Sequence, residues 1–218
     1  MISEELRFRA RDGLELEGVL DLAGPPPSVL LLCHPHPQMG GTMNAPLLLA
    51  VRDELIARRW GVLRFNFRGI GASEGESSDG GAEIADVEGG IALLRERFPG
   101  VPVALAGWSF GAAVAIRVAC RGGELAACVA IAPAVTPKPG VSAGVPAPDR
   151  CRLPCPLLII TGANDDQVRP EECKAWAGAV ENATYIELPG ANHFFWAKYD
   201  ALASRVGEFL DTVIWKEA

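Results

Sequence analysis

Residues 101–119, VPVALAGWSFGAAVAIRVA, leave fewer structural choices than any other stretch of this chain. An apolar run typical of a buried strand leads into GWSFG, and a run of small and apolar residues typical of a helix follows. A serine between two glycines suits a sharp strand-to-helix turn, because glycine at Gly107 and Gly111 removes side chains that would clash with the crowded backbone. The pattern predicts that Ser109 is a nucleophile, and that the helix N-terminus stabilises an anion formed beside it.

A second copy of the same five-residue pattern lies at residues 71–75, GASEG. It follows NFRGI and runs into a polar, glycine-rich segment, which is typical of a loop. We therefore expect Ser73 to have a structural role and Ser109 to be the nucleophile. We also expect Arg68 to anchor this loop through an ion pair.

Strand and helix patterns alternate along the rest of the chain. An Asp-Gly turn at residues 12–13, with strand patterns at residues 6–10 and 14–22, predicts an antiparallel N-terminal hairpin. Besides the strand and helix around Ser109, the patterns predict strands at residues 28–33, 61–67, 125–132, 157–161 and 184–188 and helices at residues 44–59, 83–98, 171–180 and 196–215. This order predicts an α/β fold, a mostly parallel twisted sheet of about eight strands with helices on both faces.

Length and composition limit the class of protein. The 218 residues suit one domain over residues 1–218, and an apolar fraction of 49% with a charged fraction of 22% is ordinary for a globular protein. The net charge of −7 argues against a nucleic-acid partner. No apolar run approaches the roughly 18 residues of a membrane span, and the acidic N-terminus does not resemble a signal peptide. We expect a cytoplasmic protein with no membrane partner.

The six cysteines are expected to be reduced thiols, because no secretion signal is found. Cys33 and Cys128 lie in apolar strand runs and are expected in the core. Cys151 and Cys155 lack matching histidine or cysteine ligands, which argues against zinc, while a disulfide between these two stays open. The sequence contains no dinucleotide or phosphate-binding glycine motif, so no cofactor is expected.

A serine hydroxyl alone is a weak nucleophile, so Ser109 needs a base, and the base needs a carboxylate that orients it. Of the three histidines, His34 and His36 precede the GWSFG turn, whereas His193 lies in a loop after the last predicted strand. His193 is therefore the predicted base, because the triad order in such sheets is serine, acid, histidine.

The acid is expected between the serine and the histidine. The loop GANDDQV at residues 162–168 follows a predicted strand and offers two candidates, Asp165 and Asp166. Ligands of open α/β sheets bind at the carboxyl ends of the strands, where this loop and the loop of His193 both lie, so either carboxylate has access to the imidazole.

The strand–GxSxG–helix unit, the GxxDxxV loop and the GxxH loop, in this order, resemble the α/β-hydrolase superfamily over essentially the whole chain. The HPHPxxGGTMN stretch at residues 34–44 and NFRGIGASEG at residues 66–75 are similar to a bacterial subgroup of small, lidless hydrolases. The resemblance implies that Asp165 is the acid. It also implies that no cap domain is present, because residues 133–154, where a cap is inserted in this family, are too few for one.

The oxyanion hole is expected to use the backbone N–H of Phe110, the residue after the nucleophile, and one N–H from the HPHP loop. The two prolines of this loop have no N–H, which leaves His36 as the first candidate and Gln38 as the second. The imidazoles of His34 and His36 are interpreted as braces of a rigid loop.

Other residues near these motifs receive structural interpretations. Trp108 is expected to pack beside the turn, with a place in the pocket wall left open. Residues 194–196, FFW, are expected on the buried face of the closing helix rather than in an apolar wall. The acidic residues around the start of the helix at 83–98 are interpreted as a solvated face that also favours the helix N-terminus.

These residues predict a carboxylesterase-like serine hydrolase that cleaves small or accessible acyl esters through an acyl-enzyme, with Ser109, His193 and Asp165 as its triad. A thioesterase or a peptidase would use the same triad, and a non-catalytic binding protein on the same fold stays open. A haloalkane dehalogenase is disfavoured, because the turn carries serine rather than aspartate. The expected partner is a small-molecule ester, and the sequence does not indicate an oligomeric state.

Overall fold

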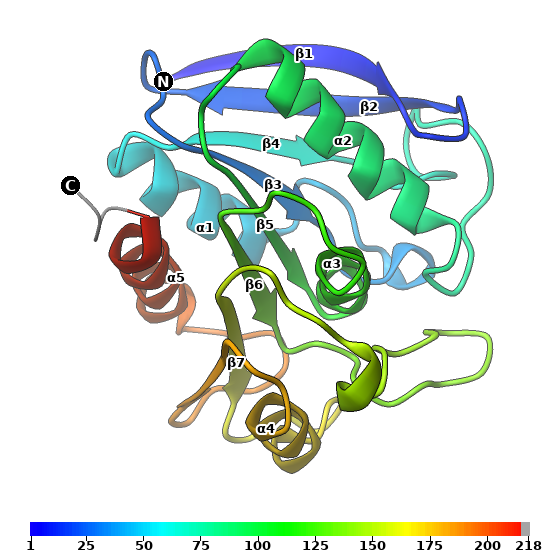
Figure 1. Cartoon of the computed structure of the whole chain (residues 1–218), viewed down its shortest axis with the longest axis vertical. Helices are drawn as coiled ribbons and strands as arrows, with labels where there is room; N and C mark the ends of the chain where they lie inside the picture. The colour runs from blue at the N-terminus through cyan, green and yellow to red at the C-terminus, as the bar shows by residue number, and fades with distance from the viewer. Residues whose placement is uncertain (215–218) are drawn as a thin grey trace.

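Figure 1 shows the computed structural model of the chain, which describes residues 1–214. In this part of the chain the strands form one eight-stranded sheet in the order β1-β2-β4-β3-β5-β6-β7-β8. The strands are β1 Ile2–Arg9, β2 Glu15–Leu22, β3 Val29–Cys33, β4 Gly61–Phe65, β5 Val103–Trp108, β6 Ala127–Ile131, β7 Leu157–Gly162 and β8 Ala183–Leu188. The α-helices are α1 Pro46–Ala57, α2 Glu83–Arg97, α3 Phe110–Ala119, α4 Pro170–Gly178 and α5 Tyr199–Ile214. The predicted α/β fold is confirmed.

Within the described residues, β2 alone runs opposite to the other strands of the sheet. β1 pairs antiparallel with β2 through a turn at Gly13, where φ is 94°, and β2 pairs antiparallel with β4. From β4 to β8 every neighbouring pair is parallel. The strands β3 to β7 are buried along their whole length, because helices cover both of their faces. The antiparallel hairpin and the parallel remainder are therefore confirmed.

Two helix layers enclose the sheet. α1 and α5 cover one face, whereas α2, α3 and α4 cover the other (Figure 1). Alternate residues of β3 serve the two layers, since Leu30 and Leu32 pack in the core under α1 and α5 while Leu31 and Cys33 pack in the other core. Cys128 lies in the same core as Cys33, as predicted.

The closing helix starts later than predicted. α5 begins at Tyr199 rather than at residue 196, because Phe195 and Ala197 have positive φ angles of 53° and 59° that a helix does not accommodate. Its predicted end at residue 215 lies outside the described residues. No helix within residues 1–214 carries an apolar stretch that would cross a bilayer.

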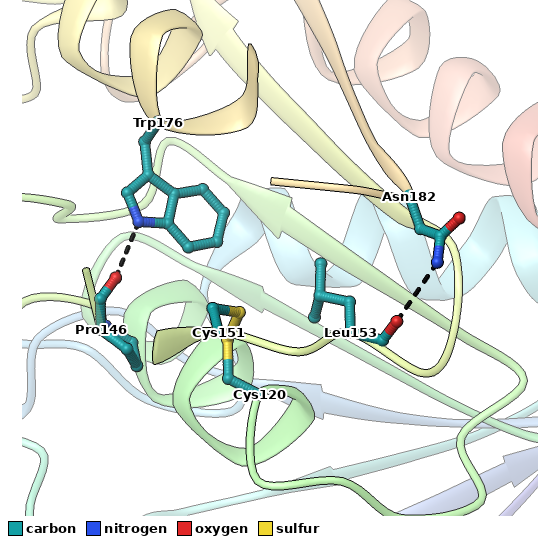
Figure 2. The surroundings of a disulfide bond; sticks show 6 residues. All are labelled: Cys120, Pro146, Cys151, Leu153, Trp176 and Asn182. Carbon is teal, nitrogen blue, oxygen red and sulfur yellow. Dashed lines mark hydrogen bonds between the residues drawn. A yellow bond between two sulfur atoms is a disulfide. The ribbon is translucent and has the colours of Figure 1, made fainter. Parts of the chain in front are cut away.

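A disulfide joins Cys120, at the end of α3, to Cys151, in the segment between β6 and β7 (Figure 2). The expectation of reduced thiols is wrong for this pair, and a bond between Cys151 and Cys155 is ruled out because Cys155 is a buried free thiol. The spacing pattern missed this bond because its cysteines are 31 residues apart and meet only when the segment returns to α3. The indole N–H of Trp176 holds the same segment by donating to Pro146 O at 2.8 Å (Figure 2).

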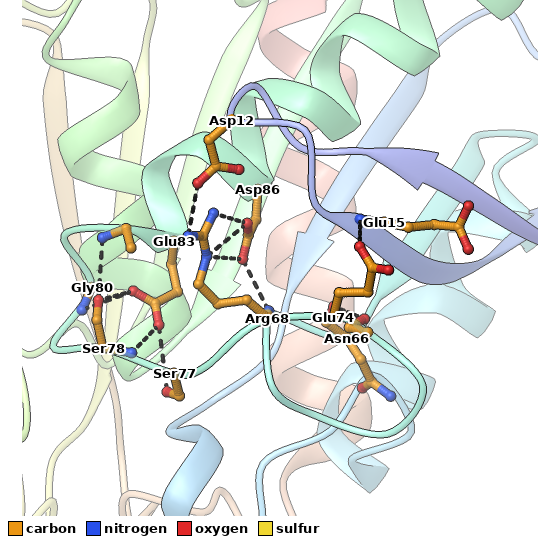
Figure 3. A network of polar contacts seen from close by, with 12 residues as sticks. Asp12, Glu15, Asn66, Arg68, Glu74, Ser77, Ser78, Gly80, Glu83 and Asp86 are labelled. Atoms are coloured by element: carbon orange, nitrogen blue, oxygen red, sulfur yellow. Dashed lines mark hydrogen bonds and ion pairs between the residues drawn. The ribbon is translucent and has the colours of Figure 1, made fainter.

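Ion pairs of the buried Arg68 fix the loop that carries the second GxSxG copy (Figure 3). Arg68 pairs with Asp86 at 2.6 Å and with Asp12 at 2.9 Å, so its predicted anchoring role is confirmed. Burial raises the pKa of the Asp86 carboxyl, and the hydrogen bonds from Arg68 oppose this shift. Glu83 is also fully buried and accepts a hydrogen bond from the Ser78 N–H at 2.6 Å. The interpretation of these acidic residues as solvated is wrong for Glu83 and Asp86, because the loop folds over the start of α2.

Candidate active site

Ser109 occupies a tight turn between β5 and α3, with φ at 54° and ψ at −110°. A Cβ atom added to Gly107 would lie 2.4 Å from the backbone of Gly111, and one added to Gly111 would lie 2.4 Å from His34 O, so only glycine fits at either position. The Ser109 N–H donates to Ile131 O at 2.8 Å and ties the turn to β6. A non-glycine residue at positive φ costs about 1–3 kcal/mol, and the surrounding backbone contacts hold Ser109 there.

Three side chains far apart in sequence form one hydrogen-bonded chain. His193 Nε2 lies 3.1 Å from Ser109 Oγ, and His193 Nδ1 lies 2.8 Å from Asp165 Oδ2. The other carboxylate oxygen, Oδ1, accepts hydrogen bonds from the N–H groups of Gln167 at 2.9 Å and Val168 at 2.8 Å. These bonds hold the Asp165 carboxylate toward the imidazole, and the imidazole toward the hydroxyl.

The loops after β7 and β8 meet because their backbones pack closely. A Cβ atom on Gly162 would lie 2.5 Å from Ala191 O, and the Asn164 N–H donates to that same oxygen at 2.8 Å. This packing turns the buried Asp165 inward, whereas Asp166 is exposed and faces a separate hollow. Of the two candidate acids, the structure brings Asp165 to His193.

Trp108 has two roles beside the turn. It is buried, with 7% of its surface exposed, and its indole N–H donates to His193 O at 3.2 Å. It also lines a hollow that contains Ser109. Trp108 therefore packs as expected, and it also holds the backbone of the histidine that faces the serine.

The backbone N–H groups of Phe110 and His36 donate to no protein acceptor within residues 1–214. Both residues line a hollow together with Ser109 and His193. The N–H of Gln38 is already used, because it donates to His36 Nδ1 at 3.2 Å. Of the two candidates in the HPHP loop, His36 therefore retains an amide that can bind a ligand.

The imidazoles of His34 and His36 brace loops. His34 Nδ1 donates to Pro35 O at 2.7 Å, and His34 Nε2 accepts from the Phe67 N–H at 3.0 Å. Burial lowers the pKa of His34 to about 4, so this imidazole is neutral near pH 7. His36 Nε2 donates to Val141 O at 2.9 Å and joins the HPHP loop to the segment after β6. The structural interpretation of both side chains is confirmed.

Two hollows meet at Ser109 and His193, and Met39 and Gln167 line both. The larger hollow has a volume of about 360 Å³, and its other walls include Gly40, Thr42, Ala45, Pro46, Trp108 and Phe194. The smaller hollow has a volume of about 260 Å³, and its other walls include Phe110, Ala134, Lys138, Val141, Ser142 and Val168. A ligand bound at the Ser109 hydroxyl can therefore place one group in each of the two hollows.

The expectation for residues 194–196 is wrong for two of the three side chains. Phe195 is fully buried in the core under α5, as expected. Phe194 is half-buried and lines the larger hollow, whereas Trp196 is 64% exposed. The positive φ of Phe195 breaks the helical direction, which sends its two neighbours outward.

The hydroxyl of Ser73, in the second GxSxG copy, is hydrogen-bonded to backbone groups, whereas that of Ser109 faces an imidazole. The Ser73 hydroxyl donates to Asn66 O at 2.7 Å and accepts from the Glu17 N–H at 3.1 Å. The side chain is buried, with 8% of the residue exposed. The structural role expected for Ser73 is confirmed.

Sequence reasoning missed a buried arginine that shapes the larger hollow. Arg64 is 4% exposed, and its Nη1 donates to Met43 O at 3.1 Å and to Asn44 Oδ1 at 2.8 Å. Its Nε donates to Asp21 Oδ2 at 2.9 Å. These bonds fix the loop before α1, which forms one wall of the hollow. A single charged residue inside the apolar strand GVLRF was the available signal.

Comparisons with known proteins agree with this fold. A family model described as serine aminopeptidase, S33, matches residues 25–152. The protein RP471 of Rickettsia prowazekii is 30% identical over 192 residues, which are 85% of this chain and 79% of that protein. XC6422 from Xanthomonas campestris, described as an α/β serine hydrolase without lid, is 28% identical with a TM-score of 0.81, covering 98% of this chain and 94% of that one. An α/β serine hydrolase homologue from Coxiella burnetii is 27% identical with a TM-score of 0.84, covering 96% and 98%.

The family match spans the elements that build the serine turn, from β3 to the segment after β6. The similarity to the two solved structures extends over 98% and 96% of this chain. The resemblance drawn from the sequence, including a fold without a lid, is confirmed. We conclude that this chain belongs to the serine aminopeptidase S33 family of α/β hydrolases.

Proposed function

We propose that this chain is a serine hydrolase that cleaves small or accessible carboxylic esters through an acyl-enzyme. The observation that carries the proposal is the hydrogen-bonded chain from Ser109 through His193 to Asp165, with contacts of 3.1 Å and 2.8 Å. Membership of a hydrolase family supports an activity of this class. The three groups match the roles of nucleophile, general base and orienting acid.

In the proposed mechanism, His193 Nε2 takes the proton of Ser109 Oγ while this oxygen attacks the carbonyl carbon of the ester. The Asp165 carboxylate accepts the hydrogen bond from Nδ1 and stabilises the imidazolium that forms. The imidazolium then donates its proton to the leaving alcohol. The neutral imidazole activates a water molecule, which attacks the acyl-enzyme and releases the acid.

The backbone N–H groups of Phe110 and His36 are proposed to bind the oxyanion of the tetrahedral intermediate. Both amides lack a protein acceptor within the described residues and lie beside Ser109. The N-terminus of α3 also favours negative charge at this position. Because the turn is held by close backbone contacts, these donors need little rearrangement when the charge develops.

The substrate class follows from the shape of the site. The two hollows, of about 360 Å³ and 260 Å³, are open to the surface beside Ser109. The segment between β6 and β7 contains one short 3-10 helix, Pro148–Arg150, and one β-bridge, between Lys138 and Ser142, and it lines the smaller hollow without forming a separate cap domain. Short acyl groups, or longer ones that project into solvent, fit such a site.

A peptidase is the second candidate, because the family model is described as serine aminopeptidase, S33. An aminopeptidase must hold the positively charged amino terminus of its substrate, for which a carboxylate is the usual partner. Among the described residues, neither hollow beside Ser109 is lined by an aspartate or a glutamate. This observation favours the ester over the peptide.

A substrate panel with matched leaving groups tests the proposal. We expect p-nitrophenyl esters with short acyl chains to be hydrolysed faster than long-chain esters, thioesters or p-nitroanilides of the same acids. A fluorophosphonate probe should label wild type and Ser73→Ala but not Ser109→Ala, with the labelled peptide identified by mass spectrometry. Absence of labelling in the wild type, or a marked preference for anilides or long chains, would contradict the proposal.

A further inference from the structure

An aromatic cluster beside His193 extends from the buried Trp108 to the exposed Trp196. The Phe194 ring meets the rings of Trp108 and His193 edge to face, with centroids 6.1 Å and 5.5 Å away. The ring of Trp196 stacks on Phe194 with centroids 5.0 Å apart and planes inclined by 14°. The ring that forms the wall of the larger hollow is therefore held by three other rings.

The backbone that carries Trp196 is strained. Phe195 and Ala197, on either side of Trp196, have positive φ angles of 53° and 59°, which are strained for residues with a side chain. The Asn192 side chain accepts hydrogen bonds from the N–H of Phe194 at 3.1 Å and from that of Trp196 at 3.4 Å. Burial of Phe195 alone explains neither the exposed indole nor the strain on both sides of it.

The larger hollow is shaped for an uncharged group. Its walls contain no lysine, arginine, aspartate or glutamate among the described residues, and they include the rings of Trp108 and Phe194. Ala45 and Pro46, at the start of α1, also line it. The smaller hollow differs, since it contains Lys138.

We infer that the larger hollow is a subsite for a planar aromatic group of the ester, with Phe194 as a specificity-determining residue and Trp196 as the residue that positions it. The inference rests on the proposed ester hydrolysis. Aromatic rings recognise one another by edge-to-face and offset contacts that a saturated ring of the same size cannot make. An ester attacked at Ser109 places its acyl part and its alcohol part in the two hollows, so one of the two parts meets Phe194.

Two pairs of esters test the subsite. Methyl phenylacetate is compared with methyl cyclohexylacetate, and benzyl acetate with cyclohexylmethyl acetate, after kcat/KM is divided by the rate of hydroxide-catalysed hydrolysis. In one pair we expect the aromatic member to be favoured by about 3- to 10-fold, the range that aromatic pairs supply. Ratios near one in both pairs would overturn the inference.

Three leucine variants assign the preference to the cluster. Phe194→Leu should bring the aromatic-to-saturated ratio close to one, and Trp196→Leu should lower it partway through KM rather than kcat. Phe98→Leu is the matched control, because Phe98 is half-buried after α2 at the other end of the sheet, and its ratio should equal that of the wild type. A ratio is unaffected by loss of folded protein, so survival of the preference in Phe194→Leu would overturn the assignment.

Equilibrium binding separates this inference from the proposed reaction. The Ser109→Ala variant retains both hollows, and binding of the same four esters is followed by tryptophan fluorescence. Tighter binding of one aromatic ester than of its saturated partner, lost in Ser109→Ala/Phe194→Leu, supports the subsite. This holds even if the wild type hydrolyses none of the four esters. Such a lack of hydrolysis would count against the proposed function alone. Equal binding of the aromatic and saturated esters would overturn the subsite alone.

Discussion

The two GxSxG segments of this chain have the same pattern and opposite surroundings. Ser109 lies between a strand and a helix with φ at 54°, and its hydroxyl faces His193 Nε2 at 3.1 Å. Ser73 lies in a loop, where its hydroxyl bonds to Asn66 O and to the Glu17 N–H. One hydroxyl is directed at a group that can take its proton, whereas the other is fully used in holding the loop.

The glycines of the two segments also act differently. Gly107 and Gly111 are needed for close backbone approach, since a Cβ at either would lie 2.4 Å from backbone atoms. Gly71 and Gly75 have φ angles of 59° and 85°, which favour glycine, and a Cβ at either would meet a side chain, that of Glu17 or Leu14, rather than the backbone. The comparison teaches that the motif marks tight backbone geometry, and that the neighbouring groups decide whether its serine is available for chemistry.

Replacing the two serines is expected to give the largest contrast. Ser109→Ala should lower kcat by about 10⁶-fold, because the nucleophile is lost. Ser73→Ala should leave kcat/KM within about threefold, but lower the free energy of unfolding by about 1–3 kcal/mol, because Asn66 O and the Glu17 N–H lose their partner. Ester hydrolysis and urea unfolding of both variants measure the two effects. Full activity in Ser109→Ala would contradict the assignment of Ser109, rather than Ser73, as the nucleophile.

Replacing the neighbouring aspartates is expected to give a smaller contrast in rate. Asp165→Asn should lower kcat by about 10⁴-fold, because the amide no longer orients and stabilises the His193 imidazolium. Asp166→Asn is the matched control, since Asp166 is exposed and lies one residue away. Initial rates with a short-chain ester measure both. Equal losses in the two variants would mean that the carboxylate next to His193 does not set the rate.

The third contrast is one of stability alone and concerns the ion pair that holds the loop of the second segment. Arg68→Met should lower the free energy of unfolding by about 3–5 kcal/mol, because Asp86 stays buried without its partner (Figure 3). Arg205→Met removes an exposed ion pair with Glu208 and should change the free energy of unfolding by less than about 1 kcal/mol. Denaturant unfolding compares the two. An equally small change in both would show that the loop does not depend on the buried pair.

Much of the fold was predictable because its signals are local. Continuous apolar runs marked the central strands, and the Asp-Gly turn marked the N-terminal hairpin. The carboxylates of Glu83 and Asp86 show where this reasoning stops. Both have the pattern of solvated charges at a helix start, yet they are buried because the loop before α2 folds back over them with Arg68 and Ser78.

Some residues of the candidate site were also predictable from local patterns, and others were not. Ser109 and His193 were identifiable from the motif and from chain order, whereas the preference for Asp165 over Asp166 came from the family resemblance. Arg64, which fixes a wall of the larger hollow, carried only the weak signal of one charge in an apolar strand.

The position of the serine turn, the order of strands and helices and the chain order of the candidate triad could be derived from the amino acids alone. They depend on glycine spacing and on hydrophobic periodicity, both of which act over a few residues. The pairing of Cys120 with Cys151, the inward turn of Asp165 and the outward turn of Phe194 and Trp196 emerged only on folding. The first two depend on contacts between segments far apart in the chain, and the third on the positive φ of Phe195, whose ring is buried in the core under α5, so neither glycine spacing nor hydrophobic periodicity predicts them.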